Sequence, residues 1–108
     1  MKLVIAIVQD YDVNQLLDAI TRAGFRATRI GSTGGFLRVG NTTLLIGVED
    51  HEVGRVLRLI EENGRERTEM LHPEIIGDMH EWYPAELVEV VVGGATVFIV
   101  NVERFERL

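Results

Sequence analysis

The sequence contains no cysteine, so disulfides and thiolate chemistry are both excluded. It also lacks a long hydrophobic run: the opening apolar stretch, Leu3–Val8, stops at Gln9 and Asp10 and is too short for a membrane span. Its 11 Lys and Arg residues are outnumbered by 17 Asp and Glu residues. The resulting net charge of −6 argues against a general binder of nucleic acids or of membrane surfaces. The single serine, Ser32, has no histidine close to it in the sequence, and no nucleophile–base pair is evident.

The length of 108 residues is enough for one domain with its own core, and we expect a single domain over residues 1–108. The apolar start lacks a small-residue cleavage site and is typical of a buried strand. We expect a cytoplasmic location by default and, because no nucleophile–base pair is evident, a protein that is not an enzyme.

One stretch, residues 22–48, has no carboxylate at all. It holds four of the eleven basic residues, namely Arg22, Arg26, Arg29 and Arg38. It also contains the run Ser32-Thr33-Gly34-Gly35-Phe36-Leu37-Arg38, followed by Gly40-Asn41-Thr42-Thr43. Glycines let a backbone approach a ligand, arginines bind phosphate, and an exposed Phe can stack on a base. The stretch is suited to a small anion bearing aromatic rings; a glycine-rich hairpin with solvated arginines is the alternative.

A helical pattern occurs twice, at an offset of 40 residues. Its apolar positions, spaced i, i+3, i+4 and i+7, are Val13, Leu16, Leu17 and Ile20, and then Val53, Val56, Leu57 and Ile60. Asp12 with Gln15 resembles a capping box, and Asp50 can cap the second helix. Gly24 and the Asn63-Gly64 pair are the expected stops, because glycine favours the left-handed conformation after a helix.

Strand candidates flank both helices, which gives a βαβ order twice. They are Leu3–Val8, Phe25–Ile30, Thr43–Val48 and Arg67–Leu71. Right-handed crossovers then predict an α+β, ferredoxin-like βαββαβ sandwich with both helices on one face of a four-stranded antiparallel sheet. Two further strands, Val88–Val92 and Thr96–Val100, flank Gly93-Gly94-Ala95 and predict an added C-terminal β-hairpin.

Some strands are apolar without alternation, as in Leu44-Leu45-Ile46 and Val97-Phe98-Ile99-Val100. Such runs are typical of strands that are buried on both faces. Because one layer of two helices covers only one face of the sheet, we infer that a subunit interface covers the other, in a closed homo-oligomer.

These segments together resemble the PII-like cyclic di-AMP receptor proteins of Gram-positive bacteria. The resemblance runs through nearly the whole chain, in residues 2–10, 25–28, 33–38, 40–43 and 92–98. It implies a homotrimer of PII architecture that binds cyclic di-AMP in three clefts between neighbouring subunits. It also implies that the loops around Gly31–Asn41 and Arg65–Ala85 are the functional ones, with no further cofactor and a downstream partner protein that the residues do not identify.

The resemblance also implies roles for single residues. Arg26 would contact a phosphate, Thr28 and Asn41 would hydrogen-bond an adenine edge, and Phe36 would stack on a base. The remaining members of the implied ligand-binding set are Ala27, Gly35, Leu37 and Gly47: Leu37 would line the base pocket, and Gly35 and Gly47 would let the backbone approach. Simpler roles stay open, since Thr28 suits any strand, Phe36 could be a hydrophobic plug and Asn41 could make a turn.

The chain departs from the family pattern mainly between Arg65 and Trp82, where histidines and carboxylates cluster. They are His72, Glu74, Asp78, His80 and Glu81. Their spacing fits no metal signature, so we predict a solvated loop and no metal site. The end of the chain, Phe105-Glu106-Arg107-Leu108, is a second place where ligand contacts can differ.

Two other functions are compatible with such a fold. An acylphosphatase-like hydrolase would need an anion-binding loop after the first strand, where this chain has the acidic Gln9-Asp10-Tyr11-Asp12. A conventional PII-type sensor of adenine nucleotides and a metabolite would need a long extended loop between the second and third strands, which is absent here. A non-catalytic receptor for cyclic di-AMP is the favoured hypothesis.

Overall fold

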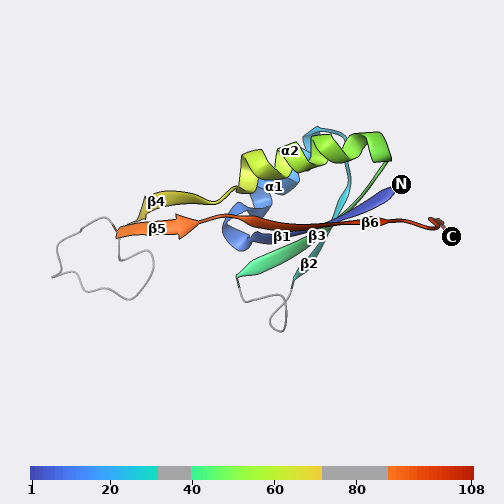
Figure 1. Ribbon diagram of the computed structural model, residues 1–108. Coiled ribbons are helices and arrows are strands. Elements are labelled where there is room, and N and C mark those ends of the chain that lie inside the picture. Colours follow the sequence, from blue (N-terminus) through green and yellow to red (C-terminus); the bar gives the residue numbers. More distant parts are fainter. Residues whose placement is uncertain (32–39, 72–87) are drawn as a thin grey trace.

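The computed structural model describes residues 1–31, 40–71 and 88–108, and these form two β-sheets and two helices (Figure 1). The elements follow the order β1 (Lys2–Gln9), α1 (Asp10–Arg22), β2 (Ala27–Gly31), β3 (Asn41–Val48), the 3₁₀ turn η1 (Asp50–Glu52), α2 (Val53–Gly64), β4 (Arg67–Leu71), β5 (Val88–Val92) and β6 (Ala95–Asn101). The predicted α+β fold class and both predicted helices are confirmed.

The main sheet is antiparallel and has the strand order β2-β3-β1-β6. Both helices lie on one face of it, as in a ferredoxin-like sandwich (Figure 1). A separate two-stranded ribbon, β4–β5, extends past one end of the sheet, and both chain termini lie at the other end (Figure 1). A second, two-stranded sheet is therefore present, but its strands are not the two that the sequence analysis expected to pair.

The fourth strand of the main sheet is β6, which pairs with β1, whereas the sequence analysis expected Arg67–Leu71 as the fourth strand. The predicted hairpin between Val88–Val92 and the strand after Gly93-Gly94 does not form, because β5 pairs with β4 and β6 pairs with β1. The composition of the two competing strands explains the outcome. β4 alternates charged and uncharged residues, while β6 is apolar on both faces and suits a place beside the central strand.

The core lies between the helices and the helix-facing side of the sheet. β1 contributes every second residue, Val4, Ala6 and Val8, each at most 1% exposed. From β3 come Leu44 and Ile46, and the helices add the predicted apolar stripes: the fully buried members are Val13, Leu16, Ile20 and Val56, with Ile60 3% exposed. The i, i+3, i+4, i+7 pattern thus identified the core face of both helices.

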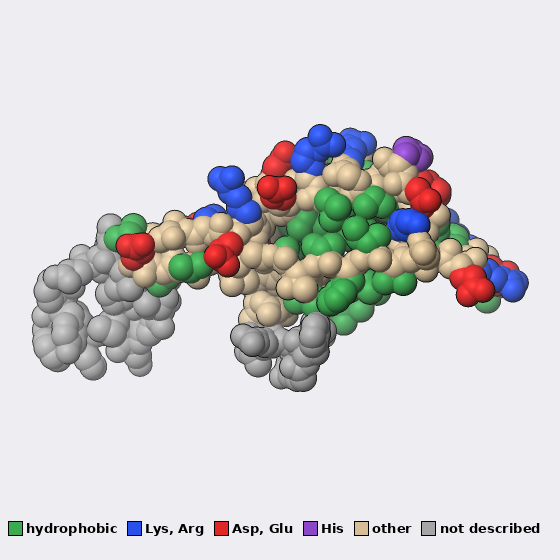
Figure 2. All heavy atoms as spheres, viewed as in Figure 1, with side chains coloured by type: hydrophobic (Ala, Val, Ile, Leu, Met, Phe, Trp, Pro, Cys, Tyr) green, Lys and Arg blue, Asp and Glu red, His purple; other side chains and the backbone are tan. Residues whose placement is uncertain are grey.

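The other face of the sheet carries no helix and is also apolar. The register places Ile5 between Leu45 of β3 and Phe98 of β6 on this side, and Val100 opposite Leu3. Phe98 and Val100 are each 45% exposed and Ile30 of β2 is 40% exposed. Figure 2 shows hydrophobic side chains along this lower side. The predicted second apolar face is present, and its burial by another subunit stays a prediction.

The helix caps differ from the predicted ones. Helix α1 begins two residues before Asp12, which is buried in an ion pair instead of capping. Before α2, the capping box is formed by Glu49 and Glu52, while Asp50 forms an ion pair with the amino group of Met1 at 3.0 Å. Gly24 ends its helix with φ +91°, as predicted. Each residue wrongly expected to cap a helix is a carboxylate that forms an ion pair instead.

A buried ion pair attaches the ribbon to α1. The Arg67 guanidinium donates to both carboxylate oxygens of Asp12, at 2.7 and 3.3 Å, although Asp12 is only 1% exposed. Arg67 also donates to Glu69 at 3.1 Å and lies over the ring of Tyr11, whose hydroxyl donates to Glu69 at 2.9 Å. The hydrogen bonds from Tyr11 and Arg67 lower the pKa of Glu69, and the one to Asp12 raises the pKa of Arg67. This cluster fixes the base of β4.

Gly93 is the second attachment of the ribbon. Its φ is +84°, its N–H donates to Oε1 of Gln9 at 2.6 Å, and a Cβ at this position would lie 2.2 Å from the Arg65 carbonyl oxygen. Only glycine fits there. The Gly93-Gly94 pair therefore directs the chain from the ribbon into β6 instead of closing a hairpin.

We predict that Asp12→Ala lowers the free energy of unfolding by about 2–3 kcal/mol, because Arg67 would lose its buried partner. The matched control is Asp18→Ala, which breaks an exposed pair with Arg22 and should cost less than about 0.5 kcal/mol. Urea titrations of the two variants measure both values. Equal losses would show that the Asp12–Arg67 pair does not hold the fold together.

Candidate functional site

A cleft of about 550 Å³ lies on the helix-free face. It is at the end of the sheet where both chain termini lie (Figure 1). It brings together three residues of the predicted ligand-binding set: Arg26, Thr28 and Gly47. Its remaining lining residues are Met1, Leu3, Leu45, Val102, Phe105 and Arg107. The cleft thus combines two arginines with an apolar floor.

The register of β2 and β3 explains how these residues meet. Thr28 pairs with Leu45, and Ala27 pairs with Ile46, so Arg26, just before β2, lies level with Gly47. Because side chains alternate along a strand, Arg26 and Thr28 lie on the helix-free face together with Gly47. No atom lies within 4 Å of the place where a Cβ on Gly47 would be, so its backbone borders open space. A ligand can approach the main chain of β3 there.

The charge of the cleft is the reverse of the charge of the protein. It is lined by Arg26 and Arg107 and by no carboxylate, in a chain of net charge −6. Three other hollows in the described part of the chain each contain at least one glutamate. Among the described residues, Arg26 forms no ion pair, and its side chain is exposed. An anion bound here meets unneutralised guanidinium groups, which suit phosphate.

Ala27 belongs to the predicted set but lies on the opposite face. It is partly buried against the core beneath α1 and α2. Any contact of Ala27 with a ligand would therefore involve its backbone. Such a contact is possible because β2 is an edge strand of the sheet, whose outer side presents unpaired backbone N–H and C=O groups.

Asn41 lies on the helix-free face too, but far from Arg26. It begins β3, six residues before Gly47, which corresponds to about 20 Å along an extended strand. There it borders a different hollow of about 310 Å³ with Gln9, Thr96 and Gly93. One subunit alone does not bring Asn41 to the cleft that contains Arg26 and Thr28.

Three predicted site residues, Gly35, Phe36 and Leu37, lie outside the described residues. The same holds for His72 and His80 and for most of the predicted loop 65–85. Within residues 1–31, 40–71 and 88–108, no group of three or more His, Cys, Asp or Glu side chains is arranged to hold a metal ion.

Sequence reasoning missed the floor and the far wall of the cleft. Leu3 and Leu45 were assigned only to strands, and the end of the chain was named without assigned roles. The signal for the floor was present, because successive side chains of β1 and β3 point to opposite faces of the sheet. This places both leucines on the helix-free face. Phe105 and Arg107 lie in a polar tail without periodicity, so no local pattern predicted their place.

A model of the cyclic-di-AMP receptor family matches residues 1–108, the whole chain. The chain belongs to this family of cyclic-di-AMP receptors. The resemblance found in the sequence is thereby confirmed. The exposed cationic cleft is the kind of site that a receptor for a phosphate-containing nucleotide requires.

The chain is also similar to a solved structure, the crystal structure of a functionally unknown protein from Pediococcus pentosaceus ATCC 25745. The two sequences are 43% identical, the match covers 99% of this chain and 96% of that one, and the TM-score is 0.80. The fold is thus shared with an experimentally determined structure. Within the part of the chain that the structure describes, no helix has the length and apolar character to cross a membrane.

We expect Arg26→Ala to weaken binding of cyclic di-AMP by about tenfold or more, because a charge-assisted contact is lost. It should also flatten the salt dependence of the affinity, since ions screen that contact. Arg29→Ala is the matched control: it removes the same charge three residues further along the chain, but Arg29 points to the helix side and donates to Asn14 at 3.3 Å. Isothermal titration at two or more salt concentrations compares them. If both variants bound cyclic di-AMP with the same affinity and the same salt dependence, the role of Arg26 as a phosphate-binding residue would be rejected.

Proposed function

We propose that this protein is a non-catalytic signalling receptor that binds cyclic di-AMP in clefts between the subunits of a homotrimer. Ligand binding orders the loops, and the ordered surface recruits or releases a partner protein. The observation that carries the proposal is the cleft beside Arg26 and Thr28, which has two arginines and no carboxylate in an acidic protein. A cytoplasmic location is part of the proposal.

The distance between two parts of the predicted site supports a shared cleft. Arg26 and Thr28 lie at one end of the helix-free face, and Asn41 lies at the other end of β3. If both parts contact one ligand, they must come from different subunits. In the proposed trimer, a neighbouring subunit supplies Asn41, together with the predicted base platform Phe36.

The apolar helix-free face supports the assembly. Partly exposed Ile5, Leu45 and Phe98 lie side by side across β3, β1 and β6. Apolar surface of this kind is usually covered by another chain, and a closed symmetric assembly covers it without leaving an open edge.

The hydrolase alternative lacks support at the place where it needs an anion site. The turn after β1 begins α1 with Asp10 and Asp12, and the only guanidinium bound to that turn, among the described residues, is Arg67, which is already paired with Asp12. A phosphate there would meet carboxylates.

The conventional PII alternative differs from the proposed function in its ligand, so a comparison of ligands decides between these two functions.

We predict that the protein binds cyclic di-AMP far more tightly than cyclic di-GMP, ATP or a linear dinucleotide. Guanine exchanges the donor and acceptor that Thr28 and Asn41 would meet, and each buried group left unpaired costs about 1–3 kcal/mol. Isothermal titration of the wild-type protein with the four ligands is the measurement. Equal affinity for the two cyclic dinucleotides would reject the assignment, and a preference for ATP would favour the conventional PII type.

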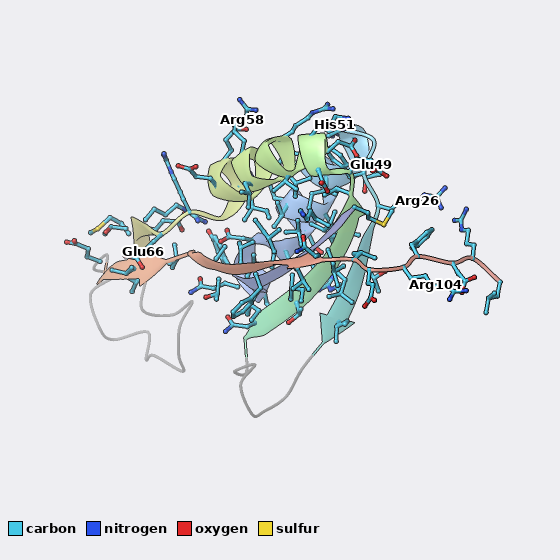
Figure 3. All side chains as sticks on the ribbon, turned by 45° about the vertical axis from the view of Figure 1, so that its right-hand side comes forward. Arg26, Glu49, His51, Arg58, Glu66 and Arg104 are labelled. Atoms are coloured by element: carbon cyan, nitrogen blue, oxygen red, sulfur yellow. The ribbon has the colours of Figure 1, made fainter. Side chains whose placement is uncertain are left out.

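We predict that sedimentation equilibrium gives about three times the chain mass of 12.1 kDa, with or without ligand. Ile5→Asp, which places a charge at the centre of the helix-free face, should dissociate the trimer. Arg58→Asp on the exposed outer side of α2 is the control and should leave the mass unchanged (Figure 3). A wild-type monomer at micromolar concentration would contradict the shared cleft.

A further inference from the structure

The two helices differ in where their charges lie. In α1 the first turn is acidic and Arg22 is in the last turn, which is the arrangement that the helix dipole favours. In α2 the order is reversed, because Arg55 is in the first turn and Glu61 and Glu62 are in the last. The charges of α2 therefore do not stabilise this helix through its dipole, which points to another use for them.

The basic side chains of this segment lie on one exposed stripe that runs from η1 into α2. His51, Arg55 and Arg58 are spaced i, i+4 and i+7, which places them on the same side of a helix, and all three are exposed. Figure 3 shows Arg58 projecting from α2 away from the sheet. At the usual rise of a helix, the basic stripe is about 10 Å long.

Neither arginine of the basic stripe has an acidic partner among the described residues. Arg58 forms no hydrogen bond or ion pair with them, and the guanidinium carbon of Arg55 lies 5.3 Å from the centre of the Phe25 ring. The ring restrains the Arg55 side chain before any partner arrives, which reduces the entropy lost on binding. The side chains of the stripe are its binding groups, because the capping box of Glu49 and Glu52 already occupies the start of the segment.

A glycine lies in the middle of the basic stripe, and the fold of the chain does not require it. Gly54 is exposed, its φ is not positive, and a Cβ at this position would meet no atom within 4 Å. Glycine destabilises a helix relative to other residues. The absence of a side chain lets another molecule approach the backbone of α2 closely, between His51 and Arg58.

The charges around the basic stripe favour a short acidic segment over an extended polyanion. Glu61 and Glu62 follow within about one turn of Arg58, and the protein as a whole has a net charge of −6. A nucleic acid or an anionic membrane would meet these carboxylates together with the arginines. A short segment of a partner protein with a few carboxylates can contact the stripe alone.

We propose that the basic stripe of His51, Gly54, Arg55 and Arg58 binds a partner protein, and that this partner presents a short acidic segment. The stripe belongs to the helix layer, whereas the cleft with Arg26 is on the helix-free face (Figure 1). It therefore stays accessible when the proposed trimer forms and when the ligand binds. The inference rests on the proposed function only in identifying this partner with the one to which the receptor signals.

The test uses a synthetic acidic peptide of about 18 residues, long enough to form a helix in water, and a matched peptide. The first has Glu at i, i+4 and i+7 of one face, and the second has Gln there. We expect the Glu peptide, at low salt, to shift the NMR signals of the backbone amides of residues 50–58, and the Gln peptide to leave them unchanged. The double variant Arg55→Ala/Arg58→Ala should bind the Glu peptide about three- to tenfold more weakly. Arg22→Ala removes the same charge from α1 and, as the control, should bind like the wild type.

Gly54→Leu separates a binding role of the glycine from a structural one. Leucine favours a helix more than glycine does, so the variant should unfold at a higher urea concentration than the wild type. Its side chain fills the space above the backbone, so the variant should lose affinity for the Glu peptide. A lower urea midpoint would show that the fold needs the glycine, and unchanged affinity would show that no partner backbone approaches there. Either result overturns the role of Gly54.

The outcomes separate this inference from the proposed function. If the wild type binds cyclic di-AMP, but the Glu peptide shifts no signal of α2 or shifts it equally in the double variant, only the basic stripe is overturned. If the peptide binds the stripe and cyclic di-AMP does not bind, only the proposed function is overturned. Shifts in β2 and β3 that cyclic di-AMP reverses would place the peptide in the cleft with Arg26 and overturn the stripe.

Two further measurements test other occupants of the basic stripe. Binding of the wild type, but not of the double variant, to phosphatidylglycerol vesicles would make the stripe a membrane-binding surface and overturn the protein partner. In sedimentation, a species heavier than the trimer that the double variant lacks would mean that the stripe binds a second copy of this chain, which would also overturn the proposal.

Discussion

The pairing of β1 with β3 and β6 is the constraint on which the rest of the molecule depends. β1 is central, so its alternation decides which residues of three strands enter the core and which stay on the helix-free face. A slip of one residue would bury Leu3 and Ile5 and expose Val4 and Ala6. It would also move Leu3 away from its place beside Gly47, because these two cleft residues are paired across β1 and β3. The cleft exists because this register holds.

The first turn of α1 connects several parts of the chain that bear on function. The N–H of Asp10 donates to the carbonyl of Gly40 at 2.8 Å, and the hydroxyl of Thr42 donates to the Asp10 carboxylate, so this turn fixes the start of β3 beside Asn41. In the same turn, the Asp12 carboxylate accepts a hydrogen bond from Arg67 at the base of the ribbon. The carboxylates of this turn, which disfavour an anion there, thus stabilise the fold. They connect β3 and β4 to the same end of α1.

The sequence predicted the candidate site in part, and the reasons differ from residue to residue. Arg26, Thr28 and Gly47 meet in one cleft because they belong to paired neighbouring strands, which strand patterns can foresee. Asn41, assigned to the same ligand, lies at the far end of its strand, and a sequence pattern contains no information about a second subunit. The tail with Phe105 and Arg107 was named as a place where ligand contacts can differ, but its position in the cleft beside Arg26 depends on the direction in which the chain leaves β6, which no local pattern indicates.

The sequence by itself determined the two helices, their buried stripes, the stop at Gly24, the strands and the family, because each depends on residues close together in the chain. Tertiary structure alone decided that β6 rather than β4 lies beside β1, and that Asp12 binds Arg67 instead of capping a helix. The physical reason is competition: a strand or a carboxylate takes the partner that lowers the free energy most among all those the folded chain brings near, and such distant partners leave no trace in local periodicity.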